Sequence, residues 1–201
     1  MTEIKHIFRD TYGLVLCGGL SNRMGTDKSM LQYYNKPQRY HVYDMVIPFC
    51  EKVFISCNAQ QAHTIVKSYD YIEDNPLYSN IGPMAALLTA FASHPKKNLL
   101  LIGCDYPFLT ATALQGFSAS CNVSAVSFFN AEADVYEPLL AWYPHTCFDE
   151  LQRVHETKQF SLQHFLKVSQ ATKYLPPDSN YIKSIDTPEA FTETYKLINA
   201  G

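Results

Sequence analysis

Short apolar runs alternate with longer segments of helical character along this chain. Apolar runs of strand length occupy residues 12–17, 52–57, 71–73, 98–103, 123–128 and 138–143. Segments that favour helix occupy residues 37–49, 60–69, 83–93, 110–118, 145–155 and 161–168, and a last helix starts near Pro188. Such alternation predicts βαβ units. We therefore expect an α/β fold with a mostly parallel central sheet and helices on both of its faces.

Composition narrows the class of protein. The chain has 201 residues, 47% of them hydrophobic and 17% charged, which predicts a single globular domain over residues 1–201. The formal net charge of −3 argues against a broad surface for nucleic acid. The N-terminal residues are polar, and the apolar stretch at residues 84–92 is shorter than a membrane helix requires. We expect a cytoplasmic protein with neither a nucleic acid nor a membrane as partner.

The six cysteines are widely and irregularly spaced, and no CxxC pair occurs. Several of them fall in strand-like runs, where a free cysteine behaves as a small buried hydrophobe. We expect buried thiols and a reducing compartment.

A glycine-rich segment between Leu16 and Lys28 is the first candidate for chemistry. Four of the eight glycines of the chain lie between Gly13 and Gly25. Glycines let backbone N–H groups approach an anion, and Arg23 and Lys28 supply charge for phosphates. The segment contains neither GxxxxGK[ST] nor GxGxxG, so it is not one of the two commoner phosphate-binding loops.

The ordered pattern GG-x-S-x-R-M-G-x-D-K after a strand resembles the MobA-like nucleotidyltransferases, and the resemblance covers nearly the whole chain. The resemblance implies a Rossmann-like nucleotidyltransferase fold. It also implies a molybdenum cofactor guanylyltransferase, which transfers GMP from GTP to molybdopterin with Mg²⁺ and releases pyrophosphate. Gly18-Gly19, where related cytidylyltransferases tend to carry alanines, favours guanine because the absent methyl group leaves room for a purine.

Further landmarks of the family follow the later strands, and they extend the set of implied site residues. The resemblance assigns catalysis to Arg23, Lys28 and Asp105, nucleotide binding to Leu16, Cys17, Gly18, Gly19, Arg23, Lys28, Asn58, Asp74 and Gly82, and metal binding to Asp105 and Asp186.

Three of these assignments have simpler alternatives in the sequence itself. Asp105 precedes Pro107 and could cap a helix, and Asn58 could be a turn residue. Asp186 is either a second metal ligand or the cap of the last helix, with Thr187 as the other candidate cap. The seven histidines form neither HxxxH nor HExxH, so no zinc site is predicted.

Other functions remain open at this stage. A sister enzyme would use CTP for the same acceptor, and Asp186 is a residue often found in such enzymes. A more distant relative would act on sugar phosphates or other small phosphorylated acceptors, and a non-catalytic nucleotide-binding module would release no pyrophosphate. Transient contact with molybdoenzymes or cofactor-handling proteins is also compatible with the resemblance.

Overall fold

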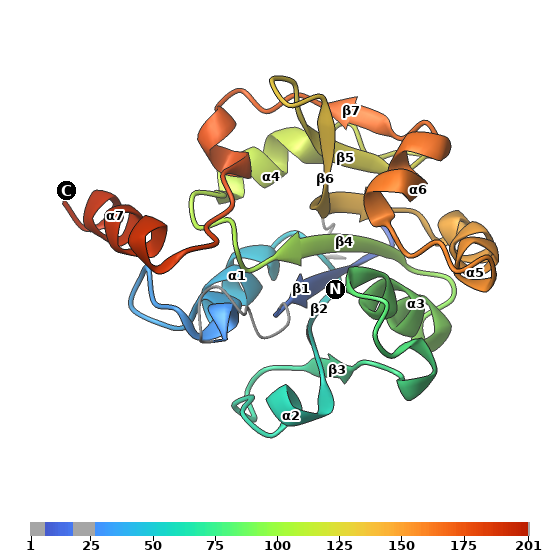
Figure 1. Cartoon of the computed structure of the whole chain (residues 1–201), viewed down its shortest axis with the longest axis horizontal. Coiled ribbons are helices and arrows are strands. Elements are labelled where there is room, and N and C mark those ends of the chain that lie inside the picture. Colours follow the sequence, from blue (N-terminus) through green and yellow to red (C-terminus); the bar gives the residue numbers. More distant parts are fainter. Residues whose placement is uncertain (1–6, 18–26, 201) are drawn as a thin grey trace, which may run out of the picture.

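The computed structural model describes residues 7–17 and 27–200, which build one seven-stranded sheet (Figure 1). The spatial order of the strands is β3-β2-β1-β4-β6-β5-β7. Their bounds are β1 (Thr11–Leu16), β2 (Lys52–Cys57), β3 (Tyr71–Glu73), β4 (Asn98–Gly103), β5 (Val126–Asn130), β6 (Val135–Tyr143) and β7 (Thr172–Tyr174).

The sheet is mostly parallel, as predicted. Strands β3, β2, β1 and β4 are parallel neighbours, and β7 is parallel to β5. Strand β6 is antiparallel to both β4 and β5, between which it lies. The carboxyl ends of β1, β2 and β4 therefore lie at one edge of the sheet, where ligands bind in open α/β folds.

Helices cover both faces of the sheet, which confirms the predicted fold class (Figure 1). Their bounds are α1 (Gln38–Val46), α2 (Ala59–Ala62), α3 (Pro83–Ser93), α4 (Ala111–Ser118), α5 (Phe148–Glu156), α6 (Leu162–Val168) and α7 (Pro188–Ile198). Side chains of α1 and α4 form one core with Val15, Ile55 and Ile102. Side chains of α3, α5 and α6 form the other core with Leu14 and Leu101. Alternate residues of each buried strand thus supply opposite faces.

The helix expected over residues 60–69 is wrong in length, because α2 ends at Ala62. The β-branched run that begins at Thr64 disfavours helix. Tertiary hydrogen bonds also take the backbone there. Arg39 Nη2 donates to the carbonyl oxygen of Thr64 at 2.7 Å, and the amide of Val66 donates to Tyr40 Oη at 3.0 Å.

Three strands also differ from the expectation by more than one residue. The strand predicted over residues 138–143 begins at Val135. The strand predicted over residues 123–128 begins at Val126 and runs to Asn130, and Val123 is 83% exposed. The short strand β7 was not predicted at all. Thr172 and Lys173 are exposed, Tyr174 is half-buried, and all three residues pair with β5. Local hydrophobicity does not predict the bounds of these strands, because pairing with neighbouring strands decides them.

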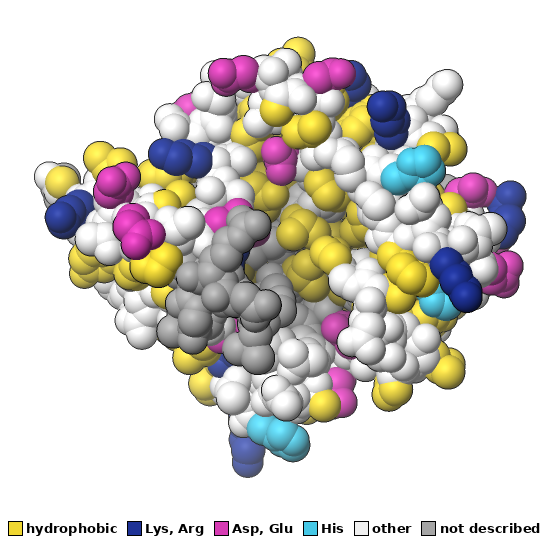
Figure 2. Space-filling model, viewed as in Figure 1, with side chains coloured by type: hydrophobic (Ala, Val, Ile, Leu, Met, Phe, Trp, Pro, Cys, Tyr) yellow, Lys and Arg dark blue, Asp and Glu magenta, His cyan; other side chains and the backbone are white. Residues whose placement is uncertain are grey.

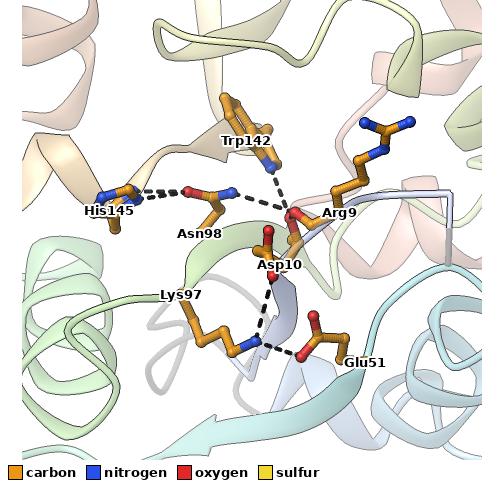
Figure 3. A network of polar contacts seen from close by, with 8 residues as sticks. Arg9, Asp10, Glu51, Lys97, Asn98, Trp142 and His145 are labelled. Atoms are coloured by element: carbon orange, nitrogen blue, oxygen red, sulfur yellow. Dashed lines mark hydrogen bonds and ion pairs between the residues drawn. The ribbon is translucent and has the colours of Figure 1, made fainter. Parts of the chain in front are cut away.

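A polar network closes the end of the sheet that holds the amino ends of β1 and β4 (Figure 3). Lys97 pairs with Glu51 at 2.5 Å and with Asp10 at 3.8 Å. Asn98 Oδ1 accepts a hydrogen bond from the amide of His145 at 3.0 Å, and its Nδ2 donates to the carbonyl of Arg9 at 3.3 Å. The side chains of Lys97, Asp10, Glu51 and Asn98 each have a complementary partner, which is what a structural cluster requires.

Within residues 7–17 and 27–200, no helix is both long enough and apolar enough to cross a membrane.

Candidate active site

Groups from distant parts of the chain meet at the carboxyl edge of the sheet. Lys28 follows the glycine-rich segment, Asp105 follows β4, and Asp186 precedes α7. Lys28 Nζ is hydrogen-bonded and ion-paired to Asp186 Oδ1. Ser184 Oγ donates to Asp105 Oδ2 at 3.0 Å and contacts Asp186 Oδ1 at 3.3 Å. One serine hydroxyl thus links both predicted metal ligands, and Asp186 joins the predicted lysine to them.

The position of Asp105 depends on the absence of a side chain at Gly103. A Cβ atom at Gly103 would lie 2.5 Å from Asp105 Oδ1 and 3.2 Å from Leu139 Cβ. Burial raises the pKa of the Asp105 carboxyl, while the hydrogen bond from Ser184 and the charge of Lys28 oppose that rise. Asp105 is therefore a carboxylate held at an energetic cost, which is typical of functional sites.

Helix capping does not explain the two aspartates. The N-cap of α4 is Thr110, whose side chain accepts from the amide of Ala113, so Asp105 is not the cap. The N-cap of α7 is Thr187, which accepts from the amide of Ala190. The capping alternative for Asp186 is therefore wrong, and its described contacts are with Lys28 and Ser184.

A cavity of about 500 Å³ lies at the carboxyl ends of β1 and β2. Its wall includes the predicted nucleotide-binding residues Leu16, Asn58, Asp74 and Gly82. Figure 2 shows hydrophobic side chains gathered near the centre of one face of the molecule. The volume lies in the range of small-molecule sites.

The last two residues of β2 hold Asp74 in this wall. Its carboxylate Oδ1 accepts from Ser56 Oγ at 3.1 Å, and its amide donates to the carbonyl of Cys57 at 2.9 Å. Burial raises the pKa of Asp74, and the Ser56 hydroxyl lowers it. Ser56 is 1% exposed, so a polar side chain is kept inside an apolar strand to orient this carboxylate.

Two other residues of the wall have backbone roles. Asn58 caps α2 by accepting from the amide of Gln61, and Gln61 in return accepts from the amide of Asn58. Gln61 also donates to Asp27 Oδ2 at 2.9 Å, which ties α2 to the end of the glycine-rich segment. Gly82 adopts φ +63° at the start of α3, a conformation that favours glycine.

A further carboxylate at the same edge belongs to Glu137 of β6. Glu137 Oε2 accepts a hydrogen bond from Tyr106 Oη at 2.9 Å. Burial raises the pKa of Glu137, and the charge of Asp105 raises it further. The carboxyl edge therefore gathers acidic groups that repel one another, where a cation or a cationic assembly would relieve the repulsion.

Cys17 was also predicted to contact the nucleotide. It is buried directly after β1 and does not line the cavity. The predicted contacts at Gly18, Gly19 and Arg23 lie outside the described residues.

The residues present fit a magnesium ion. Within the described part of the chain, no group of three or more His, Cys, Asp or Glu side chains could hold a metal by itself. Magnesium does not require such a cage, since it is usually held by one or two carboxylates together with substrate phosphates and water. Asp105 and Asp186, linked by Ser184, provide such a pair.

Sequence reasoning missed the supporting residues of the site. These are Ser56, Gly103, Tyr106, Glu137 and Ser184. A signal existed for Ser56, a buried polar residue next to the end of an apolar strand, and for Gly103, a glycine directly before Cys104-Asp105. Nothing in the sequence places Glu137 or Ser184 beside Asp105.

The fold and this edge together define a nucleotidyltransferase of Rossmann-like architecture. Residues 13–173 match the family described as "MobA-like NTP transferase domain". The chain belongs to this family, which confirms the resemblance seen in the sequence.

Two similar proteins have names that refer to the molybdenum cofactor. The "Molybdenum cofactor biosynthesis bifunctional protein" of Synechocystis sp. is 31% identical over 186 residues, covering 90% of this chain and 52% of that protein. The chain thus spans about half the length of this relative. The "Molybdenum cofactor guanylyltransferase" of Ectopseudomonas mendocina is 24% identical over 178 residues, covering 88% of this chain and 87% of that protein.

The fold also recurs in a solved structure. The crystal structure of "Molybdopterin-guanine dinucleotide biosynthesis protein A" from Archaeoglobus fulgidus superposes with a TM-score of 0.76 at 20% identity. The match covers 95% of this chain and 100% of that one.

Proposed function

We propose that this nucleotidyltransferase is a molybdenum cofactor guanylyltransferase that transfers GMP from GTP to molybdopterin and releases pyrophosphate. The observation that carries the proposal is the cluster in which Ser184 links Asp105 to Asp186 and Asp186 pairs with Lys28, at the same edge of the sheet as the cavity lined by Asp74. The names of the relatives point to the same reaction.

The chemistry assigned to the edge is mainly positioning and charge stabilisation. The acceptor phosphate attacks the α-phosphorus of the triphosphate, and pyrophosphate leaves. Lys28 neutralises phosphate charge, and Ser184 keeps the carboxylates of Asp105 and Asp186 in one orientation. Mg²⁺ held by these carboxylates would neutralise the triphosphate and polarise the reacting phosphate.

Asp74 favours guanine over cytosine as the base. An ionised carboxylate only accepts hydrogen bonds. The pairing edge of guanine offers N1–H and N2–H₂ donors side by side, which match two carboxylate oxygens, whereas the pairing edge of cytosine offers one amino donor beside two acceptors. Ser56 donates to one oxygen of Asp74 and fixes its orientation in the cavity wall.

The test is incubation of the full chain with molybdopterin and Mg²⁺ and with each nucleoside triphosphate in turn. Pyrophosphate release and the dinucleotide product are measured by mass spectrometry. The proposal predicts product with GTP alone. Product with CTP would identify the sister cytidylyltransferase, and GTP binding without pyrophosphate release would identify a binding module. Replacing molybdopterin with sugar phosphates tests the more distant acceptors.

A further inference from the structure

A fully buried arginine is hydrogen-bonded to the segment that follows α2. Arg39, in the first turn of α1, is 0% exposed, and its guanidinium donates to neutral oxygens of Thr64 and Tyr40. Within residues 7–17 and 27–200, no carboxylate lies within ion-pair distance of it, and its Nε has no hydrogen-bond acceptor. A buried charge without a counter-charge costs folding free energy, so stability alone gives no reason for an arginine at this position.

Two arms of the guanidinium hold the same residue. Arg39 Nη1 donates to Thr64 Oγ1 at 3.1 Å, and Nη2 donates to the carbonyl oxygen of Thr64 at 2.7 Å. Thr64 Oγ1 in turn donates to the carbonyl oxygen of Gln61 at 2.7 Å. Two hydrogen bonds from one planar group fix orientation as well as position. Arg39 therefore determines where the backbone lies directly after α2.

The hydrogen bonds continue from α2 to the segment that contains Lys28. Gln61 lines the cavity, and its Nε2 donates to Asp27 Oδ2 at 2.9 Å. The other carboxylate oxygen of Asp27 accepts from the amide of Ser29 at 2.9 Å. Together these contacts form one network, the Arg39 network, which ends at the backbone on both sides of Lys28.

We propose that Arg39 is a positioning residue of the nucleotide site, which holds the α2 side of the cavity in place relative to Lys28. The inference deepens the proposed function and rests on it, because the proposed function assigns a nucleoside triphosphate to this cavity and its phosphates to Lys28. Binding groups that are held in place before the ligand arrives lower the entropy cost of binding. Ligand binding, rather than folding, is then the reason for a buried guanidinium.

The first experiment breaks the Arg39 network at an exposed residue. Thr64→Val removes the hydroxyl and keeps the shape of the side chain, and Thr64→Ser restores the hydroxyl. Binding of GTP with Mg²⁺ to the full chain is measured by isothermal titration calorimetry. We expect the Kd to rise about fivefold or more in Thr64→Val, as for a lost hydrogen bond, and to stay near the unaltered value in Thr64→Ser.

Thr157→Val is the matched control. Thr157 is also exposed, and its Oγ1 donates to the carbonyl oxygen of Val154, three residues earlier, as Thr64 Oγ1 donates to Gln61. It follows α5 and does not line the cavity, so the control should bind GTP normally. Equal Kd values for Thr64→Val and Thr157→Val overturn the inference. An unaltered chain that does not bind GTP overturns the proposed function itself.

A second variant separates positioning from folding. Arg39→Met replaces a buried charge with an apolar side chain, which is often neutral or stabilising for a fold. We expect urea unfolding to show no loss of stability. GTP binding should weaken about tenfold or more, because both hydrogen bonds to Thr64 are lost. Lower stability with unchanged GTP binding would identify Arg39 as a structural residue and overturn the inference.

A measurement without nucleotide tests the Arg39 network itself. Hydrogen exchange is followed by NMR at the amides of Ser29 and Gln61, which donate to the side chains of Asp27 and Asn58. We expect exchange at both amides to be faster in Thr64→Val than in the unaltered chain. Faster exchange at Gln61 alone would show that the effect ends within α2, and would overturn the inference.

Discussion

The two ends of the central sheet use charge in opposite ways. At the amino end, Lys97 lies between Asp10 and Glu51, and each charge has a partner of opposite sign (Figure 3). At the carboxyl end, burial raises the pKa of Asp74, Asp105 and Glu137 alike. At the amino end the charged groups are paired, whereas at the carboxyl end burial makes the acidic groups costly to ionise.

The difference indicates which end carries function. Paired charges and hydrogen-bonded amides at the amino end stabilise the fold. Buried acids that raise one another's pKa oppose stability, and they persist where a ligand or a reaction uses them. Substitutions at the two ends should therefore separate activity from stability.

Lys28→Ala should have the largest effect at the carboxyl end. It removes the cation next to Asp186, and loss of one pre-positioned charged contact typically costs about 10²–10³ in rate. Steady-state pyrophosphate release from GTP and molybdopterin measures the loss. Lys97→Ala is the matched control at the amino end and should keep its turnover. Equal losses in the two variants would show that the two ends do not differ in function.

Ser56→Ala should act on nucleotide binding rather than on turnover. It deletes the hydroxyl that orients Asp74, and a hydrogen bond to a charged group is worth about 1.5–3 kcal/mol. We expect the KM for GTP to rise about tenfold or more with kcat nearly unchanged. Ser127→Ala removes another buried serine, bonded to the carbonyl of Glu137 at 2.9 Å, and should leave KM unaltered. An unchanged KM for Ser56→Ala would remove Asp74 from the nucleotide site.

Most of the elements were predictable because their signals are local. Strands β2, β3 and β4 and helix α3 have the predicted bounds, since each combines an apolar run with a distinct boundary. The part of the site that follows strands was predictable for the same reason, because parallel strands bring Asn58 and Asp105 to one edge.

The remaining elements and site residues depend on contacts between residues that are distant in the sequence. The short β7 exists only through its pairing with β5, and α2 ends where Arg39 and Tyr40 bond to the backbone around Thr64. Ser184 approaches Asp105 across 79 positions of the sequence. Such contacts leave no trace in the hydrophobic pattern of a single chain.

Asn98→Ala should lower stability without changing catalysis. It removes the amide that links His145 to Arg9 at the amino end. A lost hydrogen bond with an unsatisfied partner costs about 1–3 kcal/mol. Urea unfolding measures the loss, and the KM for GTP should match that of the unaltered chain. A variant that loses activity while fully folded would contradict the division between the two ends.

Asp105→Asn should show the smallest and most pH-specific effect on stability. An acid whose pKa is higher in the folded chain than in the unfolded chain binds protons more readily when folded. Its contribution to stability is present at low pH and is lost as the pH rises through the folded pKa. The variant should therefore be more stable than the unaltered chain near pH 7, with the gain vanishing below about pH 4. Urea unfolding at both pH values checks the sign.

The same variant gives the most direct test of the central claim, that the carboxyl edge is a magnesium-dependent guanylyltransferase site. Pyrophosphate release from GTP and molybdopterin is measured with saturating Mg²⁺ for the unaltered chain and for Asp105→Asn. The account predicts a decrease of at least about a hundredfold in a variant that is folded and no less stable at pH 7. Near-normal pyrophosphate release by the folded variant would contradict it.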